Sequence, residues 1–370
     1  MSKLFIVTGD YSGDKHAAAL VKALFEQSKD ITIEGVGGVN LENEGVKLLF
    51  NQDKMNSMGM TPKVIFDHIL MGKRIVDYLK IFKPDIVLLI DYGAFNLQLA
   101  KALKKEGLKV FYFIPPQVWA SRKWRLKTIQ KYVDKVFTIF PFEKEFYEKE
   151  GVKSIYVGHP LLNELKPKAD REEFFNRHNL DKNKKLIGVF PGSRKFEIKF
   201  LFKIFENAVK LIEKKLDNVQ FVFSKSINLP DDIYNTKYQV IKGENQELLS
   251  CSDVLILASG TVALEACLYE TPMIIAYRGP FLFYLIYLLV RTINKACLVN
   301  IITNKDIVPE FLMYNADEKK ISDEIISLLS DNKKYEAQKE GLREAKALLG
   351  NSDCINRVCF EIIEELEKNG

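Results

Sequence analysis

Two junctions in the second half of this 370-residue chain restrict its fold more than any other feature. In each, a short aliphatic and β-branched run reaches a glycine beside a hydroxyl residue and then enters a segment with helical spacing: Leu186–Arg194 (LIGVFPGSR) and Val254–Glu265 (VLILASGTVALE). A strand that passes tightly into a helix directs unpaired backbone N–H groups and the positive end of the helix dipole toward the loop. Both junctions therefore predict an anion site, and a diphosphate suits it.

The residue types in the two loops favour a nucleotide sugar. Six loop residues are candidates for the phosphate contacts: Gly192, Ser193, Arg194, Ser259, Gly260 and Thr261. The planar guanidinium of arginine matches phosphate oxygens. Glu265, one turn into the second helix, can accept hydrogen bonds from vicinal hydroxyls such as those of a ribose.

Short apolar runs alternate with amphipathic stretches along the whole chain, which predicts an α/β fold with parallel sheets. One series of predicted strands comprises 4–7, 31–36, 86–90, 110–114, 136–140 and 155–157; a second comprises 186–190, 219–223, 238–241, 254–257 and 273–276. We expect two Rossmann-like domains, 1–165 and 166–349, joined by a charged, irregular linker near 163–185 and facing an interdomain cleft. The sequence leaves open whether a C-terminal helix near 350–370 packs back on the N-terminal domain or on the partner chain of a homodimer.

Composition excludes some classes of function. Lys and Arg total 54 against 49 Asp and Glu, and an excess of five positive charges is too small to demand a nucleic acid partner. The five cysteines form no CxxC pair and show no ligand spacing with the four histidines, so we expect a reducing compartment and no structural zinc. A strand begins within a few residues of Met1, without the pattern of a signal peptide.

Two loops of the first half carry candidate acceptor-side residues. Gly9–Asp14 (GDYSGD) follows the first predicted strand and opens a helix, so Ser12 is available either as a helix cap or as a phosphate contact. Asp91 closes the strand 86–90. A carboxylate at a strand end can have a raised pKa and act as a general base, although an aspartate that caps the next helix has the same pattern.

The segment Pro115–Arg125 contains both tryptophans of the chain, including Trp119, beside several cations. Arg122 and Arg125 would share one face of a helix and could bind one anionic group, with a solvated surface helix as the alternative. His159 follows the last strand of the first series. We interpret it as a hinge or nucleotide-side residue, although most single histidines are structural.

The order of these motifs resembles the lipid-A-disaccharide synthase family over nearly the whole chain. The matching motifs are Gly9-Asp-Tyr-Ser-Gly-Asp14, Ser57-Met-Gly59, Ile90-Asp91-x-x-x-Phe95-Asn96, Pro116-x-Val-Trp-Ala120, Val157-Gly-His-Pro160, Pro191-Gly-Ser-Arg194, Ser259-Gly-Thr261 and Val299-Asn300. The family consists of inverting glycosyltransferases of the two-domain GT-B architecture. The resemblance implies transfer of 2,3-diacylglucosamine from UDP-2,3-diacylglucosamine to 2,3-diacylglucosamine 1-phosphate, giving a β-1,6 disaccharide phosphate and UDP.

The resemblance also implies roles for individual residues. Asp91 aligns with the family's catalytic aspartate, and Asn300 with the donor site. The residues expected on the acceptor side are Ser12, Gly13, Asp14, Met58, Gly59, Asn96, Trp119, Arg122 and Arg125. The chain has no Asp-x-Asp pair, and helix termini with Arg194 can neutralise the leaving diphosphate, so we expect no obligatory metal and no cofactor.

Acylated substrates predict a cytoplasmic protein bound peripherally to the inner face of the cytoplasmic membrane. Two segments are candidates for the contact: Phe281–Val290, flanked by arginines, and Val64–Leu79, in which Ile65, Ile69, Leu70, Ile75 and Leu79 alternate with cations. Ten apolar residues cannot span a bilayer, which needs about 20. Packing into the core is the alternative for both segments.

Three other functions fit parts of the pattern. A UDP-sugar epimerase shares the two-domain architecture but needs acid and base groups that this chain does not evidently pair. A non-catalytic UDP-sugar-binding relative is suggested by Ala94, which stands where the family has a second acid. Another UDP-N-acetylhexosamine transferase that acts on a lipid acceptor is a third alternative.

Overall fold

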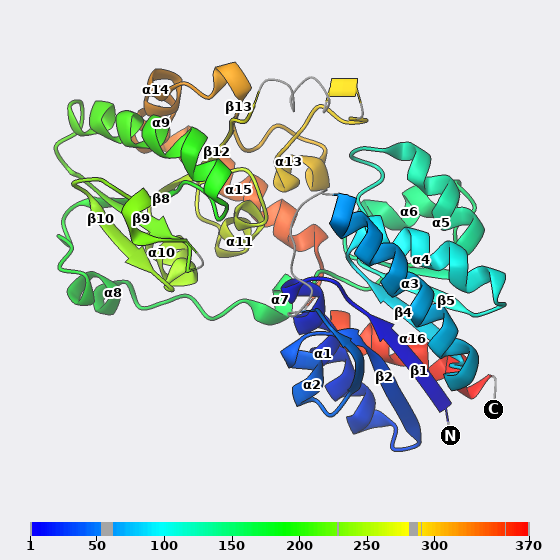
Figure 1. Ribbon diagram of the computed structural model, residues 1–370. Coiled ribbons are helices and arrows are strands. Elements are labelled where there is room, and N and C mark those ends of the chain that lie inside the picture. The colour runs from blue at the N-terminus through cyan, green and yellow to red at the C-terminus, as the bar shows by residue number, and fades with distance from the viewer. Residues whose placement is uncertain are drawn as a thin grey trace. The chain divides into compact units, whose positions relative to one another are not determined.

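The chain folds into two compact units. The computed structural model describes residues 2–52, 62–227, 229–280, 288–289, 291–351 and 353–368. Unit 1 comprises Met1–Asn163 and Asn351–Gly370, and unit 2 comprises Glu164–Gly350. Each unit has its own parallel β-sheet flanked by helices (Figure 1). The predicted α/β class with two parallel sheets is therefore confirmed.

The sheet of unit 1 has the order β3-β2-β1-β4-β5-β6-β7. Its strands are β1 (Ser2–Val7), β2 (Ile31–Gly37), β3 (Lys47–Asn51), β4 (Ile86–Ile90), β5 (Val110–Phe113), β6 (Lys135–Thr138) and β7 (Ser154–Tyr156). Every side chain of β4 is buried, as expected for a central strand covered on both faces. The strand order reverses between β1 and β4, so the loops after these two strands lie side by side.

The helices of unit 1 are α1 (Tyr11–Gln27), α2 (Val39–Asn43), α3 (Pro62–Phe82), α4 (Gly93–Lys105), α5 (Leu126–Tyr132), α6 (Pro141–Lys149), α7 (Leu161–Glu164) and α16 (Cys354–Glu367), with a 3-10 turn η2 (Lys123–Arg125) before α5. Helices α3, α4 and α5 supply Ile75, Leu79, Ala100 and Ile129 to one core with strands β1, β4 and β5. The C-terminal α16 packs against α1 in the same unit.

The sheet of unit 2 has the order β10-β9-β8-β11-β12-β13. Its strands are β8 (Lys185–Phe190), β9 (Val219–Lys225), β10 (Gln239–Lys242), β11 (Val254–Ala258), β12 (Met273–Tyr277) and β13 (Glu310–Leu312). Here the order reverses between β8 and β11, and Phe190 pairs with Leu257 at the carboxyl ends of these strands. The two loops that the sequence analysis singled out are therefore neighbours at one edge of one sheet.

Helices cover both faces of this sheet: α8 (Arg171–Arg177), α9 (Lys195–Glu213), α10 (Asn245–Cys251), α11 (Val262–Tyr269), α13 (Leu298–Thr303), α14 (Glu318–Ser330) and α15 (Asn332–Leu348), with 3-10 turns η3 (Asp231–Ile233) and η4 (Met313–Asn315). Helices α9 and α14 form one core with Ile187, Val189 and Ile256. Helices α8, α10, α11 and α15 form the other with Leu186 and Leu255. Alternate side chains of β8 and β11 thus pack into the two cores on opposite faces of the sheet.

The structure differs from the sequence expectation in three places. Strands β3 and β13 were not predicted, because Lys47–Asn51 and Glu310–Leu312 are short and only half-buried. The expectation of an irregular linker at 163–185 is wrong, since α8 lies there and buries Phe174 in unit 2. The candidate segment Phe281–Val290 lies almost wholly outside the described residues. No helix in the described ranges is long and apolar enough to cross a membrane.

Candidate functional site

The two loops after β8 and β11 differ in how their helix N-termini are used. At the start of α9 the Glu197 carboxylate accepts hydrogen bonds from Ser193 N at 2.8 Å and Arg194 N at 3.2 Å. Glu197 is 7% exposed and also accepts from Arg194 Nη1 at 3.3 Å. The expectation of unpaired N–H groups is therefore wrong for Ser193 and Arg194, because the helix supplies its own anion as a cap for these two groups.

The start of α11 is open by comparison. Its N-cap residue, Thr261, makes no side-chain capping hydrogen bond, and Gly260 has nothing within 4 Å of the position that a Cβ would occupy. Gly260 and Thr261 are exposed, and Ser259 Oγ donates to Ala296 O at 3.4 Å. Glu265 lies half-buried in the first turn of the helix. Of the two junctions, this one leaves its helix N-terminus without a side-chain cap, which is the arrangement that phosphate-binding helix ends have.

Asn300 lies in α13 with 1% of its surface exposed. Its Nδ2 donates to Val308 O and Glu310 Oε1, both at 2.8 Å, and its Oδ1 accepts from the N–H groups of Ile307 and Val308, both at 2.9 Å. These four bonds use the whole hydrogen-bonding capacity of the amide. Asn300 therefore fixes the chain between α13 and β13 rather than presenting its amide to a ligand.

In unit 1 the strained backbone gathers at the carboxyl ends of β4 and β5. Asp91 and Tyr92 have φ of 46° and 49°, and Ile114 has φ of 56°. Residues other than glycine rarely adopt this left-handed conformation, and a β-branched residue does so least of all. Each such residue costs about 1–3 kcal/mol and persists only where its surroundings impose it, most often at functional sites.

The Asp91 carboxyl group lies within this strained turn. Its Oδ1 accepts a hydrogen bond from Tyr92 N at 2.8 Å. Burial, followed by the neighbouring charge of Asp10, raises the pKa of Asp91 from 3.8 to about 6, while the Tyr92 N–H and His16 oppose the change. A carboxylate whose pKa lies near neutrality can both accept and release a proton at physiological pH. The raised pKa of Asp91 therefore suits a general base.

The backbone of this turn is fixed through hydrogen bonds to the Asp91 carbonyl oxygen. Tyr112 Oη donates to this oxygen at 2.7 Å and Asn96 Nδ2 donates to it at 2.9 Å. Both side chains are fully buried. Within the described part of the chain, Asn96 Oδ1 is buried without a hydrogen-bond partner, which costs about 1–3 kcal/mol. Asn96, expected on the acceptor side, instead lies beneath Asp91.

Tyr92 covers the first loop of unit 1. A Cβ on Gly9 would lie 2.1 Å from Tyr92 Cδ1, so the aromatic ring packs directly on the Gly9 backbone. The Tyr92 hydroxyl is 2.5 Å from His68 Nε2 of α3. Neither residue was predicted from the sequence, in which only the Gly9-Asp10 turn indicated that another group approaches the backbone closely.

The remaining residues of the first loop have separate roles. Asp10 caps α1 by accepting from Gly13 N at 2.7 Å, and Ser12 is exposed with its Oγ 3.3 Å from His16 Nε2. Asp14 is 1% exposed and accepts from Gly38 N at 2.6 Å and Asn40 N at 2.9 Å. Asp14 thus stabilises the start of α2 and does not face solvent. Two expected acceptor-side residues, Met58 and Gly59, lie outside the described residues.

Trp119 is 6% exposed and donates through Nε1 to Glu143 Oε1 at 2.7 Å. Glu143 is buried and also accepts from the N–H groups of Ile139 and Phe140 at 3.1 and 3.0 Å. Burial raises the pKa of Glu143 from 4.5 to about 7, against these three hydrogen bonds. Trp119 therefore anchors the loop after β5. Glu143 was not predicted as its partner, although Pro141-Phe-Glu143 is a helix-start pattern.

Arg122 and Arg125 do not share a face of an α-helix. Arg122 has φ of 54° and precedes η2, and α5 begins only at Leu126. Burial and then the charge of Arg122 lower the pKa of Arg125. Trp124, between them, is 60% exposed. The loop thus keeps a pair of cations near the carboxyl end of β5.

His159 is 9% exposed and its ring lies 5.2 Å from that of Phe140. Its Nδ1 accepts from Leu161 N at 3.1 Å, which fixes the start of α7 near the end of unit 1. Because Nδ1 accepts, the neutral ring carries its proton on Nε2. The contact that the structure gives His159 is that of a helix cap, and its role as a hinge or nucleotide-side residue stays a prediction.

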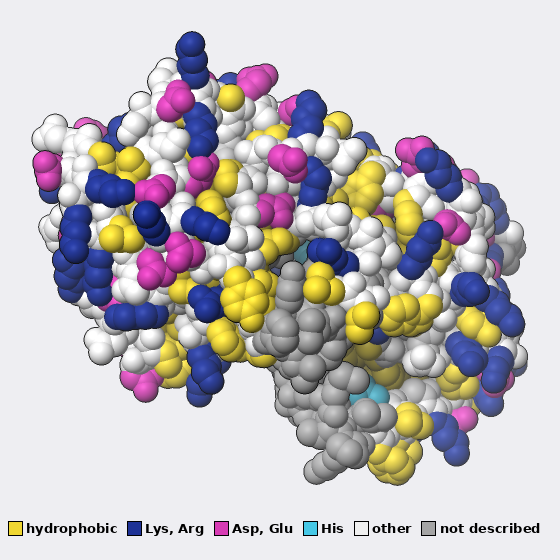
Figure 2. Space-filling model, turned by 90° about the horizontal axis from the view of Figure 1, so that it is seen from above, with side chains coloured by type: hydrophobic (Ala, Val, Ile, Leu, Met, Phe, Trp, Pro, Cys, Tyr) yellow, Lys and Arg dark blue, Asp and Glu magenta, His cyan; other side chains and the backbone are white. Residues whose placement is uncertain are grey.

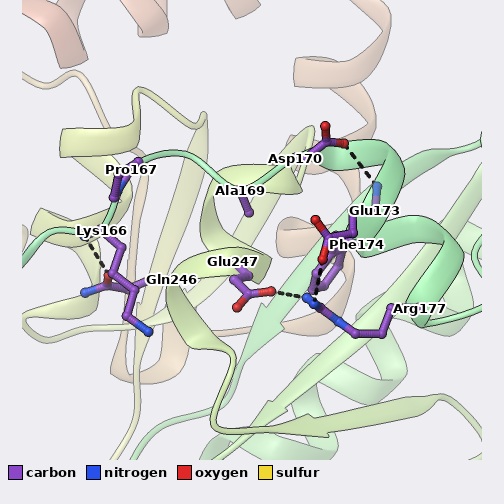
Figure 3. Close-up of a pocket in the computed structure, with 9 residues that line it drawn as sticks. All are labelled: Lys166, Pro167, Ala169, Asp170, Glu173, Phe174, Arg177, Gln246 and Glu247. Atoms are coloured by element: carbon purple, nitrogen blue, oxygen red, sulfur yellow. Dashed lines mark hydrogen bonds and ion pairs between the residues drawn. The ribbon is translucent and has the colours of Figure 1, made fainter.

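Two cavities in the described part of the chain are lined by residues outside these loops. One, of about 280 Å³, is lined by Lys166, Asp170, Arg177 and Glu247 beside α8 and α10 (Figure 3). Arg177 points into it and is already paired with Glu247. A second, of about 410 Å³, lies between α16 and β7, beside Phe360 and Arg357. Neither cavity is lined by a residue that the sequence analysis proposed for the site.

Charge and ligand chemistry add two observations. On the face shown in Figure 2, lysine and arginine side chains are interspersed with aspartate and glutamate over the surface. Among the described residues, no three His, Cys, Asp or Glu side chains are grouped so that they could hold a metal ion.

Comparison with known folds supports the architecture. The UDP-GlcNAc 2-epimerase of Neisseria meningitidis, solved with UDP-GlcNAc bound, is 14% identical with a TM-score of 0.68, covering 98% of this chain and 100% of that one. A glycosyltransferase from Rickettsia africae ESF-5 is 18% identical with a TM-score of 0.57, covering 100% and 99%. At these identities the likeness shows the fold alone.

Sequence comparison is more specific. The family model described as lipid-A-disaccharide synthetase matches residues 4–363. The lipid-A-disaccharide synthase of Syntrophus aciditrophicus (strain SB) is 33% identical, and lipid-A-disaccharide synthase 1 of Legionella pneumophila (strain Lens) is 36% identical. Each alignment covers 100% of this chain and 99% of the relative. Because the family model and these relatives match nearly the whole chain, this chain belongs to the lipid-A-disaccharide synthase family.

Proposed function

We propose that the protein catalyses the reaction for which its family is named. It transfers 2,3-diacylglucosamine from UDP-2,3-diacylglucosamine to 2,3-diacylglucosamine 1-phosphate, with inversion at the anomeric carbon, and releases UDP in lipid A biosynthesis. The observation that carries this proposal is the full-length family match combined with a buried Asp91 whose pKa is raised to about 6.

In this reaction unit 2 binds the donor. The open N-terminus of α11 accepts the diphosphate through Ser259, Gly260 and Thr261, and Glu265 holds the ribose. Arg194, whose side chain is 73% exposed, reaches the phosphate charge that develops as UDP leaves. The helix dipole and Arg194 together neutralise UDP, so a divalent metal is not obligatory. Full activity in EDTA is the expected result, and inhibition by EDTA would contradict this assignment.

Unit 1 binds the acceptor and supplies the base. Asp91 removes the proton from the acceptor 6-hydroxyl as the oxygen attacks the anomeric carbon from the face opposite UDP. Ser12, Arg122 and Arg125 are the polar groups of unit 1 that we assign to acceptor binding, because their cationic or hydroxyl side chains suit a sugar 1-phosphate. The buried residues Asp14, Trp119 and Asn96 support these loops from within.

The direct test is an assay of UDP release and disaccharide formation in detergent micelles with both acylated substrates, using wild-type protein and Asp91→Ala. Product from wild type alone is the expected result. UDP binding without product in the wild type would indicate a non-catalytic relative, to which Ala94 would contribute. Product from UDP-GlcNAc and a lipid acceptor, but not from the acylated donor, would indicate a different lipid-directed transferase.

We further propose that the protein binds the inner face of the cytoplasmic membrane through α3. Phe66 and Ile69 are each 66% exposed and Leu70 is 39% exposed, and Lys73 and Arg74 of the same helix are also exposed. Later in α3, Ile75 and Leu79 are fully buried. The first part of the helix therefore presents apolar side chains with flanking cations to its surroundings, as an interfacial helix does.

A co-sedimentation assay with vesicles of phosphatidylethanolamine and phosphatidylglycerol tests this contact. The triple variant Phe66→Ser, Ile69→Ser, Leu70→Ser is expected to remain in the supernatant while the wild type sediments. Ile81→Ser is the matched control, because Ile81 is 82% exposed on the same helix but at its other end. Equal sedimentation of the triple variant and the wild type would contradict the proposal.

A further inference from the structure

The turn that carries Asp91 is imposed on the chain and is not a local preference. Asp91 and Tyr92 are consecutive non-glycine residues with φ of 46° and 49°. Their sequence offers no glycine until Gly93, and although aspartate enters the left-handed region more readily than most residues, tyrosine does not. The conformation must therefore be held by groups outside the turn.

Two buried donors converge on one atom of this turn, the Asp91 carbonyl oxygen. Tyr112 Oη lies 2.7 Å from it and Asn96 Nδ2 lies 2.9 Å from it. The same Nδ2 donates to Ile90 O at 3.2 Å. Tyr112 comes from β5 and Asn96 from α4, so the carbonyl is fixed from two separate elements.

The orientation of the Asn96 amide is determined by these contacts. A rotation of the amide by a half-turn would place Oδ1 against two carbonyl oxygens and remove both donors. The observed orientation leaves Oδ1 buried without a hydrogen-bond partner among the described residues. The Asn96 amide therefore fixes the carbonyl groups of Ile90 and Asp91, at the cost of leaving its own Oδ1 buried and unpaired.

We propose that Tyr112, together with Asn96, is a positioning residue for the transfer reaction: by fixing the Asp91 carbonyl, it holds the strained turn and so aims the carboxylate. The inference rests on the proposed role of Asp91 as the base. Tyr112 itself does not touch substrate, because it is fully buried in β5. Its hydroxyl acts only through the backbone of Asp91.

The test compares Tyr112→Phe with Tyr269→Phe. Tyr269 is a matched control, since it is 2% exposed and donates to a main-chain oxygen, Lys166 O, at 2.9 Å, but it lies in unit 2. Both variants lose one buried hydroxyl and its hydrogen bond, so similar losses of thermal stability are expected. A stability effect alone therefore does not distinguish them.

Kinetics distinguish them. For Tyr112→Phe we expect kcat to fall on the order of 10- to 100-fold, the effect of a small misplacement of a reacting group, with KM for both substrates within about twofold of wild type. Tyr269→Phe is expected to keep the wild-type kcat. The acid limb of the pH profile is expected to move to lower pH in Tyr112→Phe, because a carboxylate that relaxes toward solvent loses the effect of burial.

The charged and titratable groups that face Asp91 remain in place in this variant. They are Asp10 and His16, from the β1–α1 junction and α1. The charge of Arg125 opposes the rise in the pKa of Tyr112, and Arg125 is also unchanged in this variant. A shift of the acid limb therefore reports the position of the Asp91 carboxylate and not the loss of a neighbouring charge.

Asn96→Ala gives an independent measurement, and keeps the inference testable if Tyr112→Phe fails to fold. Because both side chains act on one carbonyl, the double variant is expected to lose less activity than the two single effects combined. Wild-type kcat and acid limb in Tyr112→Phe, or fully additive effects, would overturn the inference while leaving Asp91 as base. Wild-type activity in Asp91→Ala would instead overturn the base assignment.

Discussion

The Glu197 carboxylate accepts a hydrogen bond from Ser193 N at 2.8 Å, so α9 carries its own anion at its N-terminus. The loop is shaped around this contact. Gly192 has φ of 119°, and a Cβ there would lie 2.6 Å from Glu197 Oε2. Glu197 also accepts hydrogen bonds from Arg194 N and Arg194 Nη1, so it fixes both the backbone and the side chain of Arg194.

Replacing Glu197 tests this arrangement. Glu197→Ala is expected to destabilise the protein by about 1 kcal/mol, as loss of a helix cap does, and to raise KM for the UDP-sugar because the Arg194 loop is no longer fixed. Urea denaturation and donor kinetics measure the two effects. The control is Glu172→Ala, an exposed first-turn glutamate of α8, expected to lie within about 0.5 kcal/mol of wild type. Tighter UDP binding in Glu197→Ala would show instead that Glu197 competes with the diphosphate.

The raised pKa of Asp91 predicts the pH dependence of activity. A base must be deprotonated, so kcat/KM is expected to fall as pH decreases through about 6. Asp91→Asn is expected to have very low activity without this acid limb. Rates measured between pH 5 and 8 in constant ionic strength check both statements, and a wild-type profile that is flat across pH 6 would contradict the assignment.

The raised pKa of Asp91 also predicts how stability depends on pH. As pH rises through this range, activity is expected to increase while the stability contributed by Asp91 decreases. The folded pKa of Asp91 is raised from 3.8 to about 6, so the folded state binds the proton more tightly than the unfolded state. Its contribution to stability is therefore lost as pH rises between these values. At about 1.4 kcal/mol per pKa unit the upper limit is on the order of 3 kcal/mol. Asp91→Asn is expected to be more stable than wild type at pH 8, as measured by urea unfolding, and equally stable at pH 3.5.

The hydrogen bond between Trp119 and Glu143 predicts a spectroscopic titration. Because burial raises the pKa of Glu143 to about 7, the partner of the Trp119 N–H gains charge near neutral pH. In a Trp124→Phe background Trp119 is the single tryptophan, and its fluorescence is expected to change with a midpoint near pH 7. Glu143→Gln in that background should abolish the transition. Persistence of the transition in the glutamine variant would assign it to another group.

The contact of Tyr92 with Gly9 predicts a suppressor pair. Gly9→Ala would place a Cβ 2.1 Å from Tyr92 Cδ1, so the ring must move and the Asp91 turn with it. We expect a loss of stability of about 1–3 kcal/mol from overpacking, and a loss of activity. Tyr92→Ala in the Gly9→Ala protein is expected to restore stability by removing the clash. A double variant no more stable than Gly9→Ala would show that the contact with Tyr92 is not the cause of the loss.

Particular elements show which parts of the fold could be predicted. Strand β4 and the runs that became β8 and β11 are short, apolar and bounded by turn residues, so their buried position follows from local pattern. Strands β3 and β13 carry no fully buried side chain, so they lack the apolar pattern that marks the other strands and were not predicted. Helix α8 was missed because charged residues surround its two buried phenylalanines, and only packing on unit 2 distinguishes it from a linker.

The sequence by itself determined the α/β class, the two series of strands and the loops that carry Asp91 and the Gly-Ser-Arg and Ser-Gly-Thr turns, because periodicity and turn chemistry act over a few residues. Only the tertiary structure decided which groups meet at those loops. Tyr112 lies under Asp91 because β5 pairs with β4, and Glu197 fills the start of α9 because Gly192 admits it. Such contacts depend on strand order and close backbone approach, which no short stretch of sequence specifies.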